Sequence, residues 1–381
     1  MKVAMIDPWG INNIGMYTNG ICSGISETTE LTLFTNYYFQ KNTNSEYEIK
    51  NIFFEKSEQM KRGKIRILLR GYEYIKSYIK VIKELRKKNY DVVHIQWLLM
   101  YKIDIWYLKK IKKHCKKLVY TAHNVIPHSK GESYVKDLKK IYKIVDAIIL
   151  HGHGIKEEFE TLFPEFKEKV VIQNHGTYLN HETIFNIDVI DKDIISKLEN
   201  YDKIFIFFGN MFYNKGVDRL AKIWIENLSE VNQLLIIAGR KNAEYKELND
   251  IEEKIYTCGN ILYINEYVEN NLLNYLINKS DVILLPYRHA SMSGVIFTAA
   301  EFNKPVLCTD TGALAEYIVN RENSFLVEND TQKYHEMLEY ISYQVSKRKL
   351  IDMGYNLNVY ISENYSWNNI GRKLYEEVYR L

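Results

Sequence analysis

Proline and glycine are scarce in this sequence, and long apolar runs are missing. Its 381 residues include only 5 prolines and 18 glycines, which argues against a long disordered or low-complexity tract. No stretch approaches the roughly 18 uninterrupted apolar residues of a membrane span, and the apolar run that ends at Asp7 is too short for a signal peptide. We therefore expect a cytoplasmic protein, long enough for two α/β domains.

Cysteine is also rare, and no pattern typical of a cofactor site is present. The four cysteines lie far apart without a CxxC pair, and Cys308 falls inside an apolar run, as a buried strand residue would. Free thiols account for this better than disulfides, and no metal or other cofactor is expected. GxGxxG and GxSxG are missing, which argues against a Rossmann dehydrogenase and a nucleophile-elbow hydrolase.

The net charge of +3 is small, but basic residues gather in the first half. Residues 56–90 contain 12 Lys or Arg against 3 Glu, and residues 109–117 read KKIKKHCKK. We interpret residues 56–90 as a surface helix pair that, with 109–117, contacts an anionic membrane, such as the inner face of the plasma membrane. A solvated, lysine-rich helix face is the alternative. Nucleic acid is not expected, because no binding module accompanies the basic residues.

Short apolar runs alternate with amphipathic stretches along both halves. This rhythm predicts βαβ units and parallel sheets covered on both faces, hence two doubly wound domains in series. We expect domains over residues 1–180 and 201–365, with a linker over 181–200 where the pattern fades. The expected strands lie within residues 3–6, 91–96, 117–124, 146–152 and 169–176 of the first half, and within 203–210, 234–240, 261–268, 281–287, 305–310 and 324–329 of the second.

Candidate binding residues of the second half follow its strands, because ligands of such sheets bind beyond the carboxyl ends of the strands. Lys215 stands at an expected helix start that already favours an anion. Arg240 follows the next strand and offers a forked donor. A further helix expected near Ser293 would aim the Ser291 and Ser293 hydroxyls, with the amides of Gly294 and Val295, at one spot. Solvated cations and a plain serine N-cap are the alternatives; taken together, the features favour a diphosphate.

In the first half, one loop and three polar residues stand at strand ends. The loop between Gly10 and Gly15 follows the first strand and is placed to close over a ligand. His123 and Asn124 follow the strand KLVYT, where a histidine suits a sugar hydroxyl, and His94 in DVVHIQW has a weaker claim. A structural role is the alternative for each histidine.

Assembled in order, these segments resemble the retaining family-four glycosyltransferases, also called glycosyl transferases group 1. The resemblance covers nearly the whole length and rests on the segments DVVHIQW, TAHN, VVIQNHG, FFGNMFYNKGVDRL, LIIAGR, DVILLPY, FNKPVLCTDTGALAEYI and YSWNNIGRKLYEEVYRL. It implies an α/β fold of the GT-B type, with two Rossmann-like domains facing across a cleft. It also implies that a C-terminal helix, residues 366–381, crosses back to the first domain.

The resemblance assigns roles to individual residues. Lys215 matches the lysine on the donor diphosphate, and His123 the histidine near the transferred sugar. The glycine loop ending at Gly15 matches one that closes over the phosphates. Val268 falls near the backbone that receives the base, and Glu316 matches a glutamate with a structural role. We take Lys215, His123 and Ser293 as the catalytic set and Asn124 and His94 as the acceptor side.

The sequence departs from the family pattern at two places. After Gly209, where an arginine is usual, it has Asn210, and either Arg240 or Arg288 is a candidate replacement. A paired-glutamate motif is also absent, since its positions carry Ala290 and Thr298; Glu301 lies one helical turn beyond. A minority pattern of the family does resemble PYRHASMSGV, in which serines and helix amides hold the donor phosphates and sugar.

These features predict a metal-independent, retaining transfer of a sugar from a UDP- or GDP-linked donor. The expected acceptor is a glycan or a lipid diphosphate, in the synthesis of a bacterial surface or capsular polysaccharide. A sugar-nucleotide epimerase shares the architecture but usually needs paired acid and base carboxylates, which are not evident. An inactive subunit that binds a nucleotide-sugar or a glycan is the third possibility.

Overall fold

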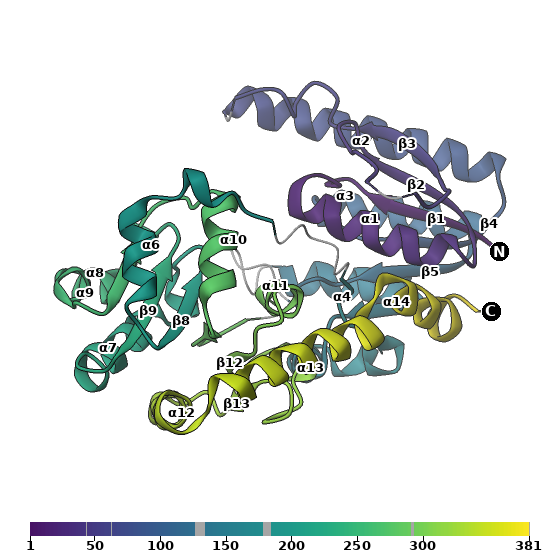
Figure 1. Ribbon diagram of the computed structural model, residues 1–381. Coiled ribbons are helices and arrows are strands. Elements are labelled where there is room, and N and C mark those ends of the chain that lie inside the picture. The colour runs from purple at the N-terminus through teal and green to yellow at the C-terminus, as the bar shows by residue number, and fades with distance from the viewer. Residues whose placement is uncertain (43, 62, 126–133, 178–183, 291–292, 381) are drawn as a thin grey trace. The chain divides into compact units, whose positions relative to one another are not determined.

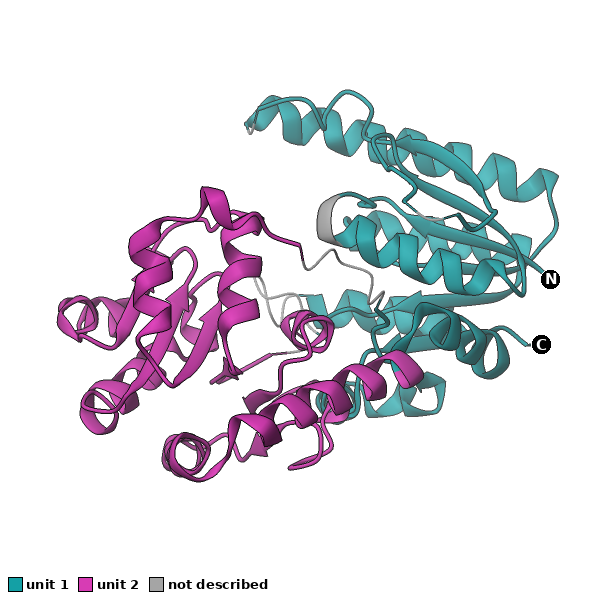
Figure 2. Cartoon of the chain, viewed as in Figure 1, with its two compact units in different colours: residues 1–178, 365–381 teal, residues 179–364 magenta. Residues whose placement is uncertain are grey.

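The chain divides into two compact units, each built around one parallel sheet. The computed structural model describes residues 1–42, 44–61, 63–125, 134–177, 184–290 and 293–380 (Figure 1). Unit 1 comprises residues 1–178 and 365–381, and unit 2 comprises residues 179–364 (Figure 2). The two doubly wound α/β units expected from the sequence are thereby confirmed.

Unit 1 contains a seven-stranded sheet in the order β3-β2-β1-β4-β5-β6-β7, and all its neighbouring strands run parallel. Residues alternate between its faces: Val3 and Met5 pack on one side, and Ala4 and Ile6 on the other. Its strands are β1 (Lys2–Asp7), β2 (Glu30–Asn36), β3 (Glu48–Phe53), β4 (Tyr90–Ile95), β5 (Cys115–Thr121), β6 (Ala147–Leu150) and β7 (Val170–Ile172).

Helices cover both faces of this sheet. Helices α1 and α14 contribute to one hydrophobic cluster, and α2, α3, α4 and α5 contribute to the other. The helical segments of unit 1 are α1 (Asn12–Ser26), α2 (Lys64–Lys87), α3 (Tyr101–Ile111), η1 (Lys112–His114), α4 (Val135–Ile144), α5 (His153–Leu162), η3 (Pro164–Lys169), α14 (Trp367–Leu374) and η7 (Tyr375–Tyr379).

The C-terminal segment packs on α1 by close backbone approach. A Cβ atom on Gly24 would lie 2.0 Å from the Trp367 carbonyl oxygen, and one on Gly371 would lie 2.1 Å from the Gly24 carbonyl carbon. The Trp367 side chain fills the space that Cβ atoms on Gly20 and Gly176 would occupy. The expected return of the C-terminal helix to the first domain is confirmed.

Unit 2 contains a six-stranded parallel sheet in the order β10-β9-β8-β11-β12-β13. Its strands are β8 (Lys203–Phe208), β9 (Gln233–Ala238), β10 (Ile261–Ile264), β11 (Val282–Leu285), β12 (Val306–Thr309) and β13 (Phe325–Val327). Its helical segments are η4 (Ile187–Val189), α6 (Lys192–Glu199), η5 (Tyr213–Lys215), α7 (Val217–Asn227), α8 (Lys246–Asn249), α9 (Glu252–Thr257), α10 (Asn270–Lys279), α11 (Val295–Glu301), η6 (Leu314–Tyr317), α12 (Thr331–Gln344) and α13 (Lys347–Tyr365).

Every strand expected from an apolar run is present, but two strands and one helix differ from expectation. Strands β2 and β3 were not anticipated, since ELTLFTN and EIKNIF mix polar residues into short runs. Residues 56–90 were expected to form a helix pair, yet α2 is one helix, whose second half is held in the core by Tyr74, Tyr78 and Leu85. Part of the expected linker is helix α6 of unit 2.

In each unit, a lysine side chain caps the C-terminal end of a helix. The Lys169 Nζ donates to the carbonyl oxygens of Tyr142, Lys143 and Val145 at the end of α4, at 2.9, 3.2 and 2.7 Å. Lys203, the first residue of β8, donates in the same way to Ile341, Ser342 and Val345 at the end of α12, at 2.7, 2.9 and 2.9 Å. A cation at a helix C-terminus satisfies carbonyls that have no partner within the helix.

Candidate functional site

The loops that follow β8 and β11 are joined at the carboxyl edge of the unit 2 sheet. Gly216 adopts φ 68°, and a Cβ there would lie 1.9 Å from the Pro286 carbonyl oxygen, so only glycine permits this approach. The Arg288 amide donates to the Asn214 carbonyl oxygen at 2.8 Å, and the Arg219 Nε donates to Pro286 at 2.9 Å. These contacts hold the predicted lysine beside the strand end that leads to α11.

Lys215 occupies the centre of this junction. Its Nζ lies 3.8 Å from the centre of the Tyr287 ring, and among the described residues no carboxylate forms an ion pair with it. Burial lowers the pKa of Lys215 to about 8, because removing an ammonium from water favours its neutral form. A half-buried ammonium on an aromatic face, without a protein counter-ion, suits an anionic ligand.

Tyr287 connects Lys215 to the start of α11. The Tyr287 hydroxyl and the Ser293 Oγ lie 3.2 Å apart, and the Val295 amide donates to that Oγ at 3.4 Å. Ser293 is 6% exposed and precedes the N-cap of α11, which is Gly294, so the serine is not the N-cap itself. Its hydroxyl orders the turn that leads into the helix. Gly294 is exposed, and a Cβ there would meet no atom within 4 Å.

The other α11 residues of the prediction lie farther along the helix or outside the description. Thr298 is half-buried, and its hydroxyl donates to the Gly294 carbonyl oxygen at 3.5 Å. Glu301, also half-buried, ends the helix. Ser291 lies outside the described residues.

Arg288 is already paired with a carboxylate of the protein. Its guanidinium donates through Nη1 and Nη2 to the two carboxylate oxygens of Asp218, at 2.7 and 2.8 Å, and this bond raises the pKa of Arg288 above its usual value. Tyr245 donates to the same carboxylate. Arg288 therefore ties the start of α7 to the loop after β11, and a ligand would have to compete with Asp218 for it.

Arg240 is the less committed of the two candidate arginines. It is exposed just after β9, and among the described residues it forms no ion pair. The Met211 amide donates to the Arg240 carbonyl oxygen at 2.9 Å, which places its backbone beside exposed Asn210. Gly209 adopts φ 111°, with open space where a Cβ would be. Val268 is half-buried between β10 and α10.

In unit 1, His123 belongs to an aromatic cluster at the carboxyl end of β5. Its ring stacks on Trp97 with a centroid separation of 4.1 Å and an interplanar angle of 3°. Tyr17 meets it edge-on at 5.1 Å. Its Nδ1 lies 3.1 Å from the His151 Nε2, and its Nε2 lies 3.2 Å from the Gln96 Oε1.

The hydrogen bonds around His151 assign the proton of His123. The His151 Nδ1 must donate to the Gln173 carbonyl oxygen, at 2.9 Å, because a carbonyl can only accept. Burial lowers the pKa of both histidines, so the neutral His151 Nε2 accepts from the His123 Nδ1. His123 then has its lone pair at Nε2. The Gln96 side chain satisfies this lone pair only when its amide is turned so that an N–H, in place of the Oε1, faces the ring.

The remaining unit 1 residues of the prediction are placed as follows. His94 is 1% exposed, with Tyr379 on one ring nitrogen at 2.5 Å and Thr121 on the other at 2.7 Å. It therefore joins β4 to the C-terminal segment. Asn124 is half-buried beside His123. Gly15 lies in the first turn of α1, where a Cβ would come within 2.8 Å of the Gly10 carbonyl oxygen.

Family models match both units. Residues 202–342 match the model described as Glycosyl transferases group 1, and residues 38–180 match the one described as Glycosyltransferase Family 4. The chain belongs to the family-four, group 1 glycosyltransferases. Its fold is GT-B.

Similar proteins agree with this assignment. This glycosyltransferase is 24% identical over 307 residues to the uncharacterized glycosyltransferase MJ1607 of Methanocaldococcus jannaschii, covering 75% of this chain and 74% of that protein. It is 25% identical over 279 residues to a 41.2 kDa protein in the cps region of Klebsiella pneumoniae, covering 69% of this chain and 72% of that protein. Among solved structures, Anabaena HepE in complex with UDP has a TM-score of 0.67 at 14% identity, with 100% of both chains covered.

Three residues of the candidate site were not anticipated from sequence. The Tyr287 ring packs against the Lys215 ammonium, and its hydroxyl contacts Ser293. Asp218 forms an ion pair with Arg288, and His151 accepts the proton of His123. The signal for Tyr287 was its place directly after a buried strand and a proline. Nothing local marks Asp218 or His151, because their partners are far away in the sequence.

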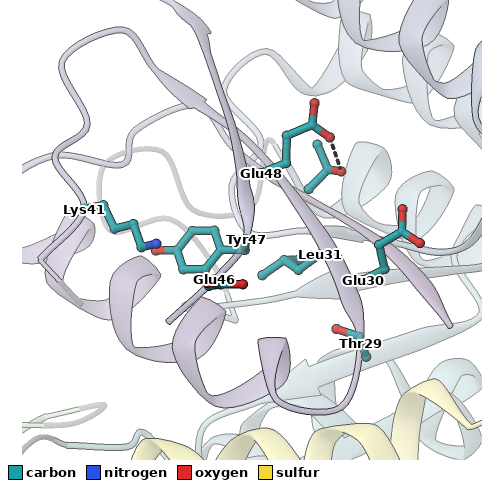
Figure 3. A pocket seen from close by; sticks show the side chains of 8 residues that line it. Thr29, Glu30, Leu31, Lys41, Glu46, Tyr47 and Glu48 are labelled. Carbon is teal, nitrogen blue, oxygen red and sulfur yellow. Dashed lines mark hydrogen bonds between the residues drawn. The ribbon is translucent and has the colours of Figure 1, made fainter. Parts of the chain in front are cut away.

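Other features of the described residues bear on the site. A cavity of ≈ 470 Å³ lies at the start of β2 and β3 (Figure 3). It lies at the edge of the unit 1 sheet opposite the carboxyl ends of the strands. Its lining includes the carboxylates of Glu30, Glu46 and Glu48 and the ammonium of Lys41, and Glu48 is also paired with Lys88 at 2.7 Å. Such an acidic lining is unfavourable for phosphate. Within the described ranges, no three His, Cys, Asp or Glu side chains could hold a metal ion. No helix among the described residues has the length and apolar character needed to cross a bilayer.

Proposed function

We propose that this glycosyltransferase moves a sugar from a UDP- or GDP-linked donor to a glycan or a lipid-diphosphate acceptor in bacterial surface or capsular polysaccharide synthesis. The observation that carries the donor class is the Lys215 ammonium, held on Tyr287 and paired with no carboxylate of the described residues. The UDP and UDP-glucose complexes of HepE support a nucleotide-sugar, and the cps-region relative supports polysaccharide synthesis. The basic segments 56–90 and 109–117 add a contact with an anionic membrane to this proposal.

Charge stabilisation on the departing diphosphate is the main task of such a site. In our proposal the Lys215 ammonium and the backbone amide of Gly294, just ahead of α11, bind the β-phosphate as the sugar bond breaks. The first amides of α11 itself already donate to Ser293 and Gly294. Ser293, through its bonds to Tyr287 and Val295, holds the helix start in position. A β-phosphate oxygen then takes the acceptor's proton on the same face of the sugar, which retains the anomeric configuration without a protein nucleophile or a metal.

His123 takes the acceptor-side role in this proposal. Its proton stays on Nδ1 because His151 accepts it, so the Nε2 lone pair is available to a sugar hydroxyl in place of Gln96. The neutral state that burial imposes on His123 suits a hydrogen-bonding role with a hydroxyl better than pairing with the diphosphate.

The test of the donor site is Lys215→Ala, assayed as acceptor-dependent release of nucleotide from a panel of UDP- and GDP-sugars. We expect the rate to fall by about 100-fold or more, the loss typical of a group that stabilises transition-state charge. The matched control is Lys222→Ala, which removes an exposed lysine from α7. Turnover of Lys215→Ala close to that of the control would refute the proposed role. NMR of the product anomer and activity in EDTA test retention and metal independence.

An inactive nucleotide-sugar-binding subunit is the second candidate. It is favoured by Asn210 in place of the usual arginine and by the engagement of Arg288 with Asp218. Thermal-shift screening distinguishes the two: a sugar nucleotide that stabilises the chain without any release of nucleotide, with or without acceptors, supports the inactive subunit.

A further inference from the structure

Helix α2 carries a row of exposed apolar side chains along most of its length. Ile65, Leu68, Tyr72, Ile75 and Ile79 are 73%, 75%, 61%, 37% and 44% exposed. They alternate at spacings of three and four residues, so they share one face of the helix. We call this set the α2 stripe.

The α2 stripe is not part of the hydrophobic core of unit 1. Another face of α2 supplies Tyr74, Tyr78, Val81 and Leu85, each at most 1% exposed, to the hydrophobic cluster. The helix thus has two apolar faces, and only one is covered within the described chain. Figure 1 shows α2 at the margin of unit 1. A contiguous exposed apolar row on a monomer marks an interaction surface.

The exposed charged residues beside the α2 stripe are lysines. Lys76 and Lys83 follow Tyr72 and Ile79 by four residues, Lys80 follows Lys76 by four, and all three lysines are exposed. The two acidic residues of α2 are occupied elsewhere. Glu73 accepts from the backbone amides of residues 56 and 57 at 2.8 and 3.1 Å, and Glu84 binds the ammonium groups of residues 50 and 87, both at 2.8 Å.

Helix α3 extends this surface. The Tyr107 hydroxyl donates to the Ile75 carbonyl oxygen at 3.0 Å, which sets α3 beside the stripe. Next to it, Trp106 is 52% exposed. It lines a cavity of ≈ 530 Å³ whose other side chains are those of Ile144 and the lysines at positions 109, 110, 112 and 113. At the far end of α2, the Arg86 Nε donates to the His114 Nε2 at 3.3 Å, which joins both basic segments.

We propose that the α2 stripe, with Trp106 and the bordering lysines, lies on the surface of an anionic lipid bilayer. Apolar side chains enter the headgroup boundary, a tryptophan suits that interface, and lysines pair with lipid phosphates. A second copy of this chain is the other conceivable occupant, since the spacing resembles a coiled-coil seam. The charge pattern favours the bilayer. In a pair of identical α2 helices, the lysines beside the stripe would find no acidic side chain of the partner's α2 to pair with, because both glutamates of that helix are engaged elsewhere.

Vesicle flotation of the full chain tests the proposal. Phosphatidylcholine vesicles with about one-third phosphatidylglycerol should bind the protein at low salt, and neutral vesicles should not. Binding should weaken at about 0.5 M NaCl, because surface charge is screened. The readout needs no donor or acceptor, so its failure is independent of the proposed sugar transfer.

Two variants separate the apolar and the charged contributions. Leu68→Ser with Ile79→Ser, and separately Lys76→Ala with Lys80→Ala and Lys83→Ala, should each lower the partition coefficient by about tenfold or more. Each basic residue near an anionic surface contributes roughly a fivefold factor. The matched controls are in unit 2: Ile351→Ser with Tyr355→Ser, which are 60% and 62% exposed, and the exposed lysines in Lys222→Ala with Lys246→Ala and Lys254→Ala.

Three results would overturn the proposal. One is equal binding of the stripe variants and their controls; another is no binding to anionic vesicles at low salt. The third is a change from dimer to monomer in Leu68→Ser with Ile79→Ser by light scattering, with vesicle binding unchanged, which would assign the stripe to a second copy. Circular dichroism of each variant establishes that α2 is still folded.

Discussion

At the scale of single residues, the protonation of Lys215 sets the charge that the proposed donor site presents to a ligand. Burial on Tyr287 lowers the pKa of its ammonium to about 8, and no carboxylate in the described part of the chain pairs with it to oppose the shift. Below that pH the free protein presents a cation, and above it an increasing share of the molecules presents a neutral amine. Above that pH, the binding of a diphosphate that requires the charged lysine is therefore coupled to the uptake of a proton by Lys215.

The affinity for a nucleoside diphosphate should therefore fall as the pH rises through about 8, by up to about tenfold per unit above it. Calorimetric titrations with UDP and GDP between pH 6.5 and 9.5 measure this, and the buffer dependence of the heat reports proton uptake. Lys215→Arg should remove the slope, because a guanidinium stays charged over the whole range. An unchanged slope in that variant would assign the titration to another group.

Arg288 shows what sequence alone could not decide in the site. Strand ends and the family resemblance were enough to propose Lys215, His123 and Ser293 as candidates. Whether Arg288 was free could not be predicted, since its partner Asp218 lies 70 residues away. Partners brought together by the sheet determine charge and proton positions, and local sequence carries little trace of them.

At the scale of elements, the close contact of α1 with α14 depends on glycines, which have no side chain. In Gly24→Ala, the new methyl group would meet the Trp367 carbonyl oxygen at 2.0 Å, and backbone cannot give way as a flexible side chain can. We expect the free energy of unfolding to fall by about 1–3 kcal/mol, as for an overpacked core. Urea denaturation followed by tryptophan fluorescence measures it.

Gly71→Ala is the control for this change. It lies in the middle of α2, where a Cβ would meet no atom within 4 Å. Alanine should be neutral there or stabilise the helix by up to about 1 kcal/mol. If both alanines had the same effect, close packing of α14 would not explain the glycine at position 24.

Apolar runs predicted most of the elements but not the polar ones. Eleven expected strands correspond to β1 and β4 through β13, because a strand buried on both faces is apolar throughout. The edge strand β3 is half-exposed and β2 contains Thr32 and Thr35, so neither has such a run. For α2, the basic and apolar residues indicated a surface helix, but only the packing showed which apolar residues are buried.

At the scale of the whole molecule, unit 1 is built from two separate stretches of chain. Trp367, Ile370 and Leu374 are each at most 3% exposed and complete the cluster under α1. Removing residues 365–381 should cost at least about 3 kcal/mol, the usual cost of deleting a buried tryptophan. Cleavage within unit 1 by a dilute protease should then become faster by on the order of 100-fold.

Mass spectrometry of the fragments distinguishes the units in this experiment. Peptides from residues 1–178 should appear early in the truncated protein, while those from 184–364 should keep the rate seen in the intact chain. Equal protection of both stretches would mean that the C-terminal segment contributes little to unit 1.

The return of α14 to α1 has a consequence for synthesis on the ribosome. Unit 2 is complete in sequence once residue 364 has been added, whereas the unit that begins at Met1 still lacks its final helix. The first half of the nascent chain must therefore keep the apolar side of α1 uncovered while the second half emerges. The order of completion is the reverse of the order of translation, so the part that is made first keeps apolar surface exposed for longest.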